Sequence, residues 1–68
     1  MRLLSMDEVR SLKGVNYSRA HLFRLIRAGK FPAPIKLGEN RNAFVETEVD
    51  AWIEQRVVER DALNAEIH

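Results

Sequence analysis

Hydrophobic residues recur at helical spacing in the first half of the chain and alternate with polar residues further along. In the clearest helical segment, Leu22, Leu25 and Ile26 fall on one side of a helix that turns by about 100° per residue. Arg24 and Arg27 fall on the opposite side. This spacing predicts an amphipathic helix that buries its apolar side and leaves its basic side exposed.

Two serine residues stand where helices are expected to begin. Ser5 can cap a helix over residues 6–12, and Glu8 then occupies the third helical position, which completes a capping box. Ser18 can cap the amphipathic helix, which we expect over residues 19–28. Two short helices joined by a turn predict a helix-turn-helix, in which the second helix is the recognition helix.

The chain after Gly29 cannot continue the second helix. Gly29 suits the left-handed position at a helix end, and the prolines within residues 31–34 lack the amide hydrogen that a helix needs. Residues 35–45 then predict two short strands, because glycine and asparagine residues at 38–42 favour a turn between them. A hairpin of this size beside a helix-turn-helix is typical of a wing.

A third helix is expected from Thr47, which can act as its cap, to about residue 66. Trp52 lies on the apolar side of this helix. We expect its ring to pack in the core with Phe44 and Leu25.

The chain has 68 residues, which is enough to bury one core, so we expect a single domain over residues 1–68. Residues 57–68 are either an extension of the third helix or a frayed tail. Leu63 and Ile67 would continue the apolar side of that extension, where they could form a subunit contact. The predicted fold class is mainly α: a small winged helix-turn-helix with three helices and a two-stranded β-hairpin wing.

Charge is divided unevenly along the chain. Residues 18–42 carry six basic residues and one acidic residue, whereas residues 43–68 carry two basic and seven acidic residues. No cysteine is present, which excludes disulfides and thiolate metal sites, and no apolar run is long enough to span a membrane. We therefore expect a soluble cytoplasmic protein with no cofactor, no metal, no membrane partner and no small-molecule substrate.

The basic side of the second helix is the strongest functional signal. Arg24, Arg27 and nearby Arg19 form this side, and no acidic residue occurs between positions 18 and 30. Arginine on a recognition helix can form a forked hydrogen bond with O6 and N7 of guanine in the major groove. An ordinary solvated surface is the alternative, and the placement of the arginines on the second helix of a pair favours nucleic acid.

The hairpin adds basic residues to this surface. Lys36 and Arg41 can follow a phosphate strand or enter a minor groove, whereas Asn40 is equally compatible with a simple turn. His21, at the edge of the basic side, is either a base reader or an exposed spacer. Phe23 either packs under the wing, which we favour, or contacts the methyl group of a thymine.

The run GVNYSRAHLFRLIRAGKFPAPIKLGENRNAFVETEVDAWIEQR, residues 14–56, closely resembles the AlpA family of phage-type transcriptional regulators, which are related to excisionase and MerR-like winged-helix proteins. The matching pieces include YSR at 17–19, AGKFP at 28–32 and EVDAWI at 48–53. The resemblance implies a DNA-binding regulator encoded on a prophage or other mobile element. The candidate DNA-binding residues are Tyr17, Ser18, Arg19, His21, Arg24, Arg27, Lys36, Asn40 and Arg41.

The sequence thus predicts a sequence-specific regulator of transcription that binds double-stranded DNA. It carries no P-loop or nucleophile elbow, so we do not expect an enzyme. A single module of this size buries too little surface for strong selectivity, which favours a homodimer or cooperative copies on tandem sites. Two alternatives stay open: an excisionase-like architectural factor that bends DNA for recombination, and a protein-protein interaction module whose arginines contact an acidic partner.

Overall fold

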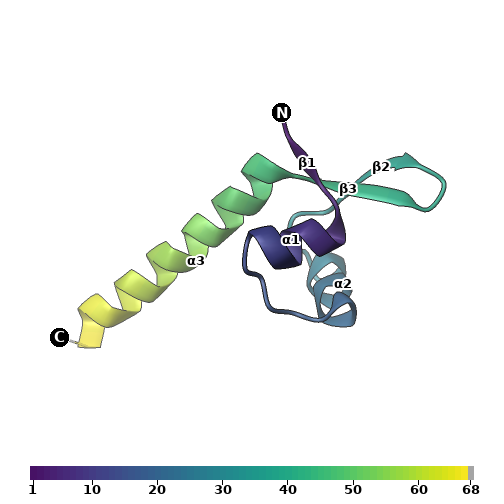
Figure 1. Cartoon of the computed structure of the whole chain (residues 1–68). Helices are drawn as coiled ribbons and strands as arrows, with labels where there is room; N and C mark the ends of the chain where they lie inside the picture. Colours follow the sequence, from purple (N-terminus) through teal and green to yellow (C-terminus); the bar gives the residue numbers. More distant parts are fainter. Residues whose placement is uncertain (68) are drawn as a thin grey trace.

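The computed structural model describes residues 1–67, with side chains described as far as residue 65. Its elements are β1 (Leu3–Leu4), α1 (Met6–Leu12), α2 (Arg19–Arg27), β2 (Ile35–Gly38), β3 (Arg41–Val45) and α3 (Glu46–Ile67). Figure 1 shows α1 and α2 packed beneath a small sheet, with α3 leading away from both. The described part of the chain is mainly helical, and the prediction of three helices is confirmed.

The predicted helix ends of α1 and α2 are confirmed by their hydrogen bonds. Oγ of Ser5 accepts from the backbone N–H of Glu8 at 3.1 Å, while Oε1 of Glu8 accepts from the backbone N–H of Ser5 at 2.9 Å. Hydrogen bonding from Ser5, first from its backbone N–H and then from its side chain, holds the pKa of the Glu8 carboxyl below its usual value. Oγ of Ser18 accepts from the backbone N–H of His21, and Gly29 follows α2 with a φ of 73°. Local sequence therefore determines where both helices begin and where α2 ends.

The sheet has three strands, not the two of the predicted hairpin. Its order is β1-β3-β2, and both pairs are antiparallel. Leu4 of β1 pairs with Phe44 of β3, which places an N-terminal residue directly in the core. The predicted hairpin is present as β2 and β3. The third strand was not predicted, because β1 consists of only two residues, too few to show the alternation that identifies a strand.

The third helix begins two residues earlier than a cap at Thr47 predicts. Glu46 is its first residue and directly follows the last residue of β3, so Thr47 lies inside the first turn and the prediction that Thr47 caps the helix was wrong. The backbone N–H of Glu46 donates to the carbonyl oxygen of Arg2 at 2.9 Å. Pairing with the N-terminal segment therefore occupies the first N–H group of α3, and the strand continues into the helix without a loop.

The core lies between α1, α2, β3 and the first turns of α3. Its fully buried side chains are Leu4, Val9, Leu22, Phe44 and Val49. Phe31 links this core to Trp52: its ring centroid lies 5.8 Å from that of Phe44 and 4.8 Å from that of Trp52. Trp52 is half-buried against the core, and its indole N–H donates to the carbonyl oxygen of Lys30 at 2.7 Å. This bond joins α3 to the segment that follows α2.

The far end of α3 projects from the rest of the molecule (Figure 1). The molecule as a whole, α3 included, measures 50 × 25 × 19 Å along its principal axes. A helix of 22 residues is about 33 Å long, so only its first turns can contact so small a core. Val58 and Leu63 are exposed on the projecting part. The side chain of Ile67, which the sequence placed on the same side as Leu63, and all of His68 lie outside the described residues.

Candidate nucleic-acid interface

The α2 helix has one buried and one exposed side, as its sequence predicts. Leu22 is fully buried, and Leu25 and Ile26 are half-buried against the core. Arg24 and Arg27 are exposed on the other side. Packing against the core therefore fixes which way the arginines face.

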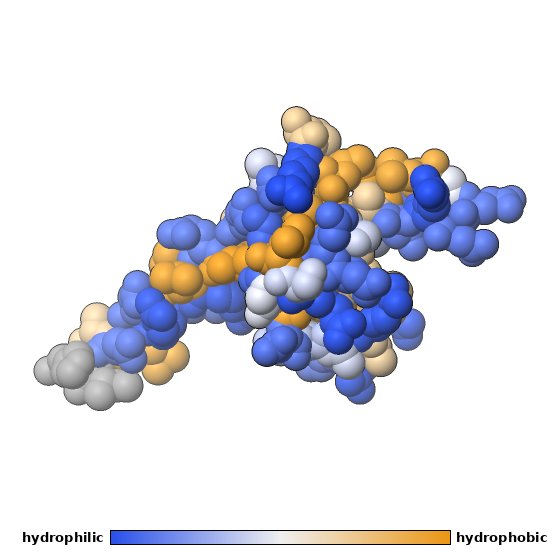
Figure 2. Space-filling view, viewed as in Figure 1, coloured by the Kyte–Doolittle hydropathy of each residue, from blue (hydrophilic) through white to orange (hydrophobic). Residues whose placement is uncertain are grey.

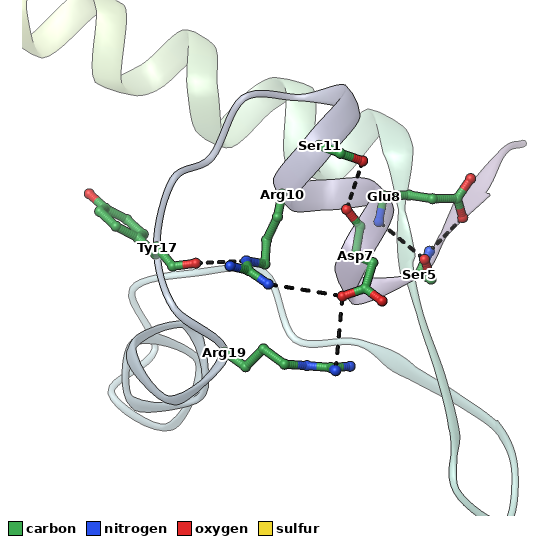
Figure 3. A network of polar contacts seen from close by, with 7 residues as sticks. All are labelled: Ser5, Asp7, Glu8, Arg10, Ser11, Tyr17 and Arg19. Carbon is green, nitrogen blue, oxygen red and sulfur yellow. Dashed lines mark hydrogen bonds and ion pairs between the residues drawn. The ribbon is translucent and has the colours of Figure 1, made fainter.

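Arg19 is also exposed, but its guanidinium group points back towards α1 (Figure 3). Its Nη1 lies 3.9 Å from Oδ1 of Asp7, and Nη1 of Arg10 lies 4.0 Å from the same oxygen. Nε of Arg10 donates to the carbonyl oxygen of Tyr17 at 2.9 Å. These contacts join α1 to the turn that precedes α2. Arg19 thus helps to orient α2 in addition to contributing positive charge.

The N-terminal end of α2 carries a pair of aromatic rings in contact. The centroids of Tyr17 and His21 lie 4.5 Å apart, with the rings tilted by 57°. Tyr17 is exposed, whereas His21 is half-buried. Ser18 accepts a hydrogen bond as the helix cap, and its hydroxyl group still has its own hydrogen to donate. Tyr17 and Ser18 therefore place two hydroxyl groups near the start of the helix.

The predicted hairpin residues all lie on exposed positions of β2, β3 and the turn between them. Asn40 has a φ of 60°, in the left-handed region that asparagine tolerates better than most residues. This conformation explains the asparagine as a turn residue. Lys36 and Arg41 have exposed side chains on the two strands. Figure 2 shows mainly hydrophilic residues over α2 and at the tip of the hairpin.

A groove of about 480 Å³ lies between α2 and the hairpin. Its lining includes Arg19, Phe23, Pro34, Leu37, Asn40 and Arg41. The structure therefore brings three of the predicted residues, Arg19, Asn40 and Arg41, around one depression. The other six predicted residues do not line it: Tyr17, Ser18 and His21 lie at the start of α2, Arg24 and Arg27 further along it, and Lys36 on β2.

For Phe23 the sequence favoured packing under the wing and left contact with a thymine methyl group as the alternative. Its side chain lines the groove and the residue keeps 46% of its surface exposed. Leu37, across the groove on β2, is 57% exposed. In the sequence, the position of Phe23 outside the apolar side of α2 indicated that its ring does not belong to the buried side of the helix. Whether the ring is covered depends on how close the hairpin lies to α2, which the sequence does not show.

Within the described residues, the acidic residues of α3 form no ion pair with the basic residues of α2 and the hairpin. Among the described residues, the α3 carboxylates pair with Arg2, with Lys13 or with arginines of α3 itself. Four basic residues of α2 and the hairpin form no ion pair with any described residue: Arg24, Arg27, Lys36 and Arg41. Their positive charge is therefore left uncompensated by the acidic tail.

Comparison with known proteins relates this arrangement to a family. The family model described as prophage CP4-57 regulatory protein (AlpA) matches residues 2–57. The chain belongs to the AlpA family. The matched AlpA region contains every residue of the candidate interface and ends within α3. The family is thus one of phage-associated regulatory proteins, as the resemblance of residues 14–56 predicted.

A curated relative of this AlpA protein is the uncharacterized protein ORF88 of Enterobacteria phage P4. It is 39% identical over 59 residues, which cover 87% of this chain and 65% of the relative. The chain thus spans about 65% of the length of that relative. No solved structure matches the chain significantly. Within residues 1–67, no helix is both long enough and apolar enough to cross a membrane.

Proposed function

We propose that this AlpA protein regulates genes of a prophage or related mobile element by binding double-stranded DNA as a winged helix-turn-helix. The observation that carries the proposal is the basic surface formed by Arg24, Arg27, Lys36 and Arg41. These residues project from one helix and the neighbouring hairpin and are free of ion pairs within the described residues. The regulatory role of the family supports the same conclusion.

The two elements have different roles in the proposed complex. The α2 helix lies in the major groove, where Arg24 and Arg27 can reach base edges. The hairpin acts as the wing, and Lys36 and Arg41 contact the phosphates or the adjacent minor groove. The hydroxyl groups at the start of α2 hold a phosphate, because the positive end of the helix dipole lies there.

One copy of the protein forms a small interface. A single module of this kind buries about 600–1,000 Å² of protein surface on DNA, which limits selectivity. We therefore propose that two or more copies bind together, as a homodimer or on tandem sites. The acidic α3 faces away from the DNA in this arrangement, because its carboxylates would be repelled by phosphates.

Footprinting on the DNA that flanks the gene, followed by fluorescence anisotropy on the protected duplex, tests the proposal. We expect Arg24→Ala and Arg27→Ala each to weaken binding by about 1–3 kcal/mol. Arg60→Ala is the matched control, since Arg60 is an exposed arginine of α3 paired with Asp61. Variants of α2 that bind as tightly as the wild type would instead favour a protein partner for the basic surface.

A further inference from the structure

Phe23 is a large apolar side chain that the fold covers only in part. The other phenylalanines and Trp52 form ring contacts around the core, whereas Phe23 takes part in none of the aromatic pairs of the described residues. It keeps 46% of its surface exposed. Burial of exposed apolar surface of this kind against a partner is favourable, because it removes the surface from water.

The position of Phe23 on α2 restricts what that partner is. Phe23 lies four residues after Arg19 and four before Arg27, and residues at this spacing lie on the same side of a helix. A partner in contact with Arg27 therefore also meets the Phe23 ring. The partner must carry negative charge and, between its charged groups, an apolar group.

The groove beside α2 has the same mixed character. Leu37 is exposed on the hairpin side of the groove, and Arg19 and Arg41 also line it. Apolar surface is therefore placed among basic groups on both elements of the candidate interface. Figure 2 shows this mixture, with hydrophobic residues along the hairpin beside its hydrophilic tip.

DNA combines negative charge and an apolar group in a single thymidine nucleotide. The phosphates supply the negative charge, and the 5-methyl group of thymine is the apolar group that a base pair presents in the major groove. We propose that Phe23 determines specificity for thymine: its ring, on an apolar surface extended by Leu37, contacts a thymine 5-methyl group. This inference rests on the proposed binding of double-stranded DNA and adds the base that α2 prefers.

The test removes the methyl group and nothing else. The probes are the protected duplex from the footprint and a series of duplexes in which deoxyuridine replaces thymine at one position at a time. We expect the wild-type protein to bind about four-fold less tightly when one contacted methyl group is missing, and equally at the other positions. Phe23→Ala should bind the thymine and deoxyuridine duplexes with the same affinity.

Two further variants separate the ring from its surroundings. Phe23→Leu keeps an apolar side chain and should retain a reduced preference for thymine. Leu63→Ala removes an exposed apolar residue from α3, 59% exposed against 46% for Phe23, and should keep the full preference. Circular dichroism confirms that each variant is folded before binding is measured.

The outcomes distinguish this inference from the proposed function. If the wild-type protein binds the thymine duplex and every deoxyuridine duplex equally, the role of Phe23 is wrong although DNA binding stands. A preference for thymine that persists in Phe23→Ala contradicts the inference in the same way. If the protein binds no duplex from the flanking DNA, the proposed function fails and the inference fails with it.

Discussion

Nζ of Lys13, at the end of α1, lies 2.9 Å from Oδ1 of Asp50 in α3. The same ammonium group lies 3.2 Å from Oε2 of Glu46, one helical turn earlier. Only 20% of the Lys13 side chain is exposed. Lys13 therefore joins α1 to the start of α3 and fixes the direction in which that helix leaves the core.

The two carboxylates make the contribution of Lys13 to stability dependent on pH. Hydrogen bonds first with Asp50 and then with Glu46 raise the pKa of Lys13 above its ordinary value of 10.5. A raised pKa in the folded state means that the stabilisation is complete below the unfolded pKa and is lost as the pH rises through the folded pKa. We therefore expect Lys13→Met to be less stable than the wild type at neutral pH, with the difference shrinking above pH 10.5.

Urea unfolding of both proteins at neutral pH and at about pH 11 measures this difference. Comparing the two proteins cancels every contribution of pH that both proteins share. A difference in stability that is the same at both pH values would show that packing of the Lys13 side chain, rather than its charge, stabilises the fold.

Leu22 is the residue of α2 that the core buries completely. We expect Leu22→Ala to lower the free energy of unfolding by about 2–5 kcal/mol, because it removes buried surface and leaves a cavity. Leu12→Ala is the matched control on α1, since Leu12 is 57% exposed and should change stability little. Equal effects of the two substitutions in urea unfolding would contradict the position assigned to α2.

Gly29 allows α2 to end where it does. Its φ of 73° lies in the left-handed region, and a Cβ atom added there would meet nothing within 4 Å. Gly29→Ala should therefore cost about 1 kcal/mol through backbone strain alone. Gly38→Ala is the control, because Gly38 has equal space but no positive φ, and we expect a change within about 0.5 kcal/mol. Thermal unfolding of both variants checks the ranking, and a larger loss at Gly38 would overturn it.

The elements with local signatures could be predicted from the sequence. The caps at Ser5 and Ser18 and the helix end at Gly29 each depend on residues within a few positions of one another. The apolar spacing of α2 likewise fixed its buried side, and with it the exposure of Arg24 and Arg27. The exposure of Arg24 and Arg27 was therefore predicted correctly, although their contacts with DNA stay predictions.

Features that depend on distant parts of the chain could not be predicted. β1 forms because Leu3 and Leu4 pair with Val45 and Phe44, and no local pattern indicates that pairing. The neighbouring Arg2 supplies the carbonyl oxygen that accepts a hydrogen bond from the backbone N–H of Glu46. This bond lies at the observed start of α3, before Thr47.

The candidate site shows the same limit. Arg19 extends towards Asp7 across the turn between helices, and the exposure of Phe23 depends on how close the hairpin lies. Both are consequences of tertiary packing.

The central claim is that the uncompensated basic surface of α2 and the hairpin binds the phosphates of a DNA duplex. Its most direct test is the affinity for the footprinted duplex as a function of salt concentration. If the four basic residues of this surface together neutralise about four phosphates, log K should fall against log salt with a slope of about −3.6, and Lys36→Ala should reduce the magnitude of that slope by about 0.9. Binding that does not change with salt, or no binding to any duplex from the flanking DNA, would contradict the claim.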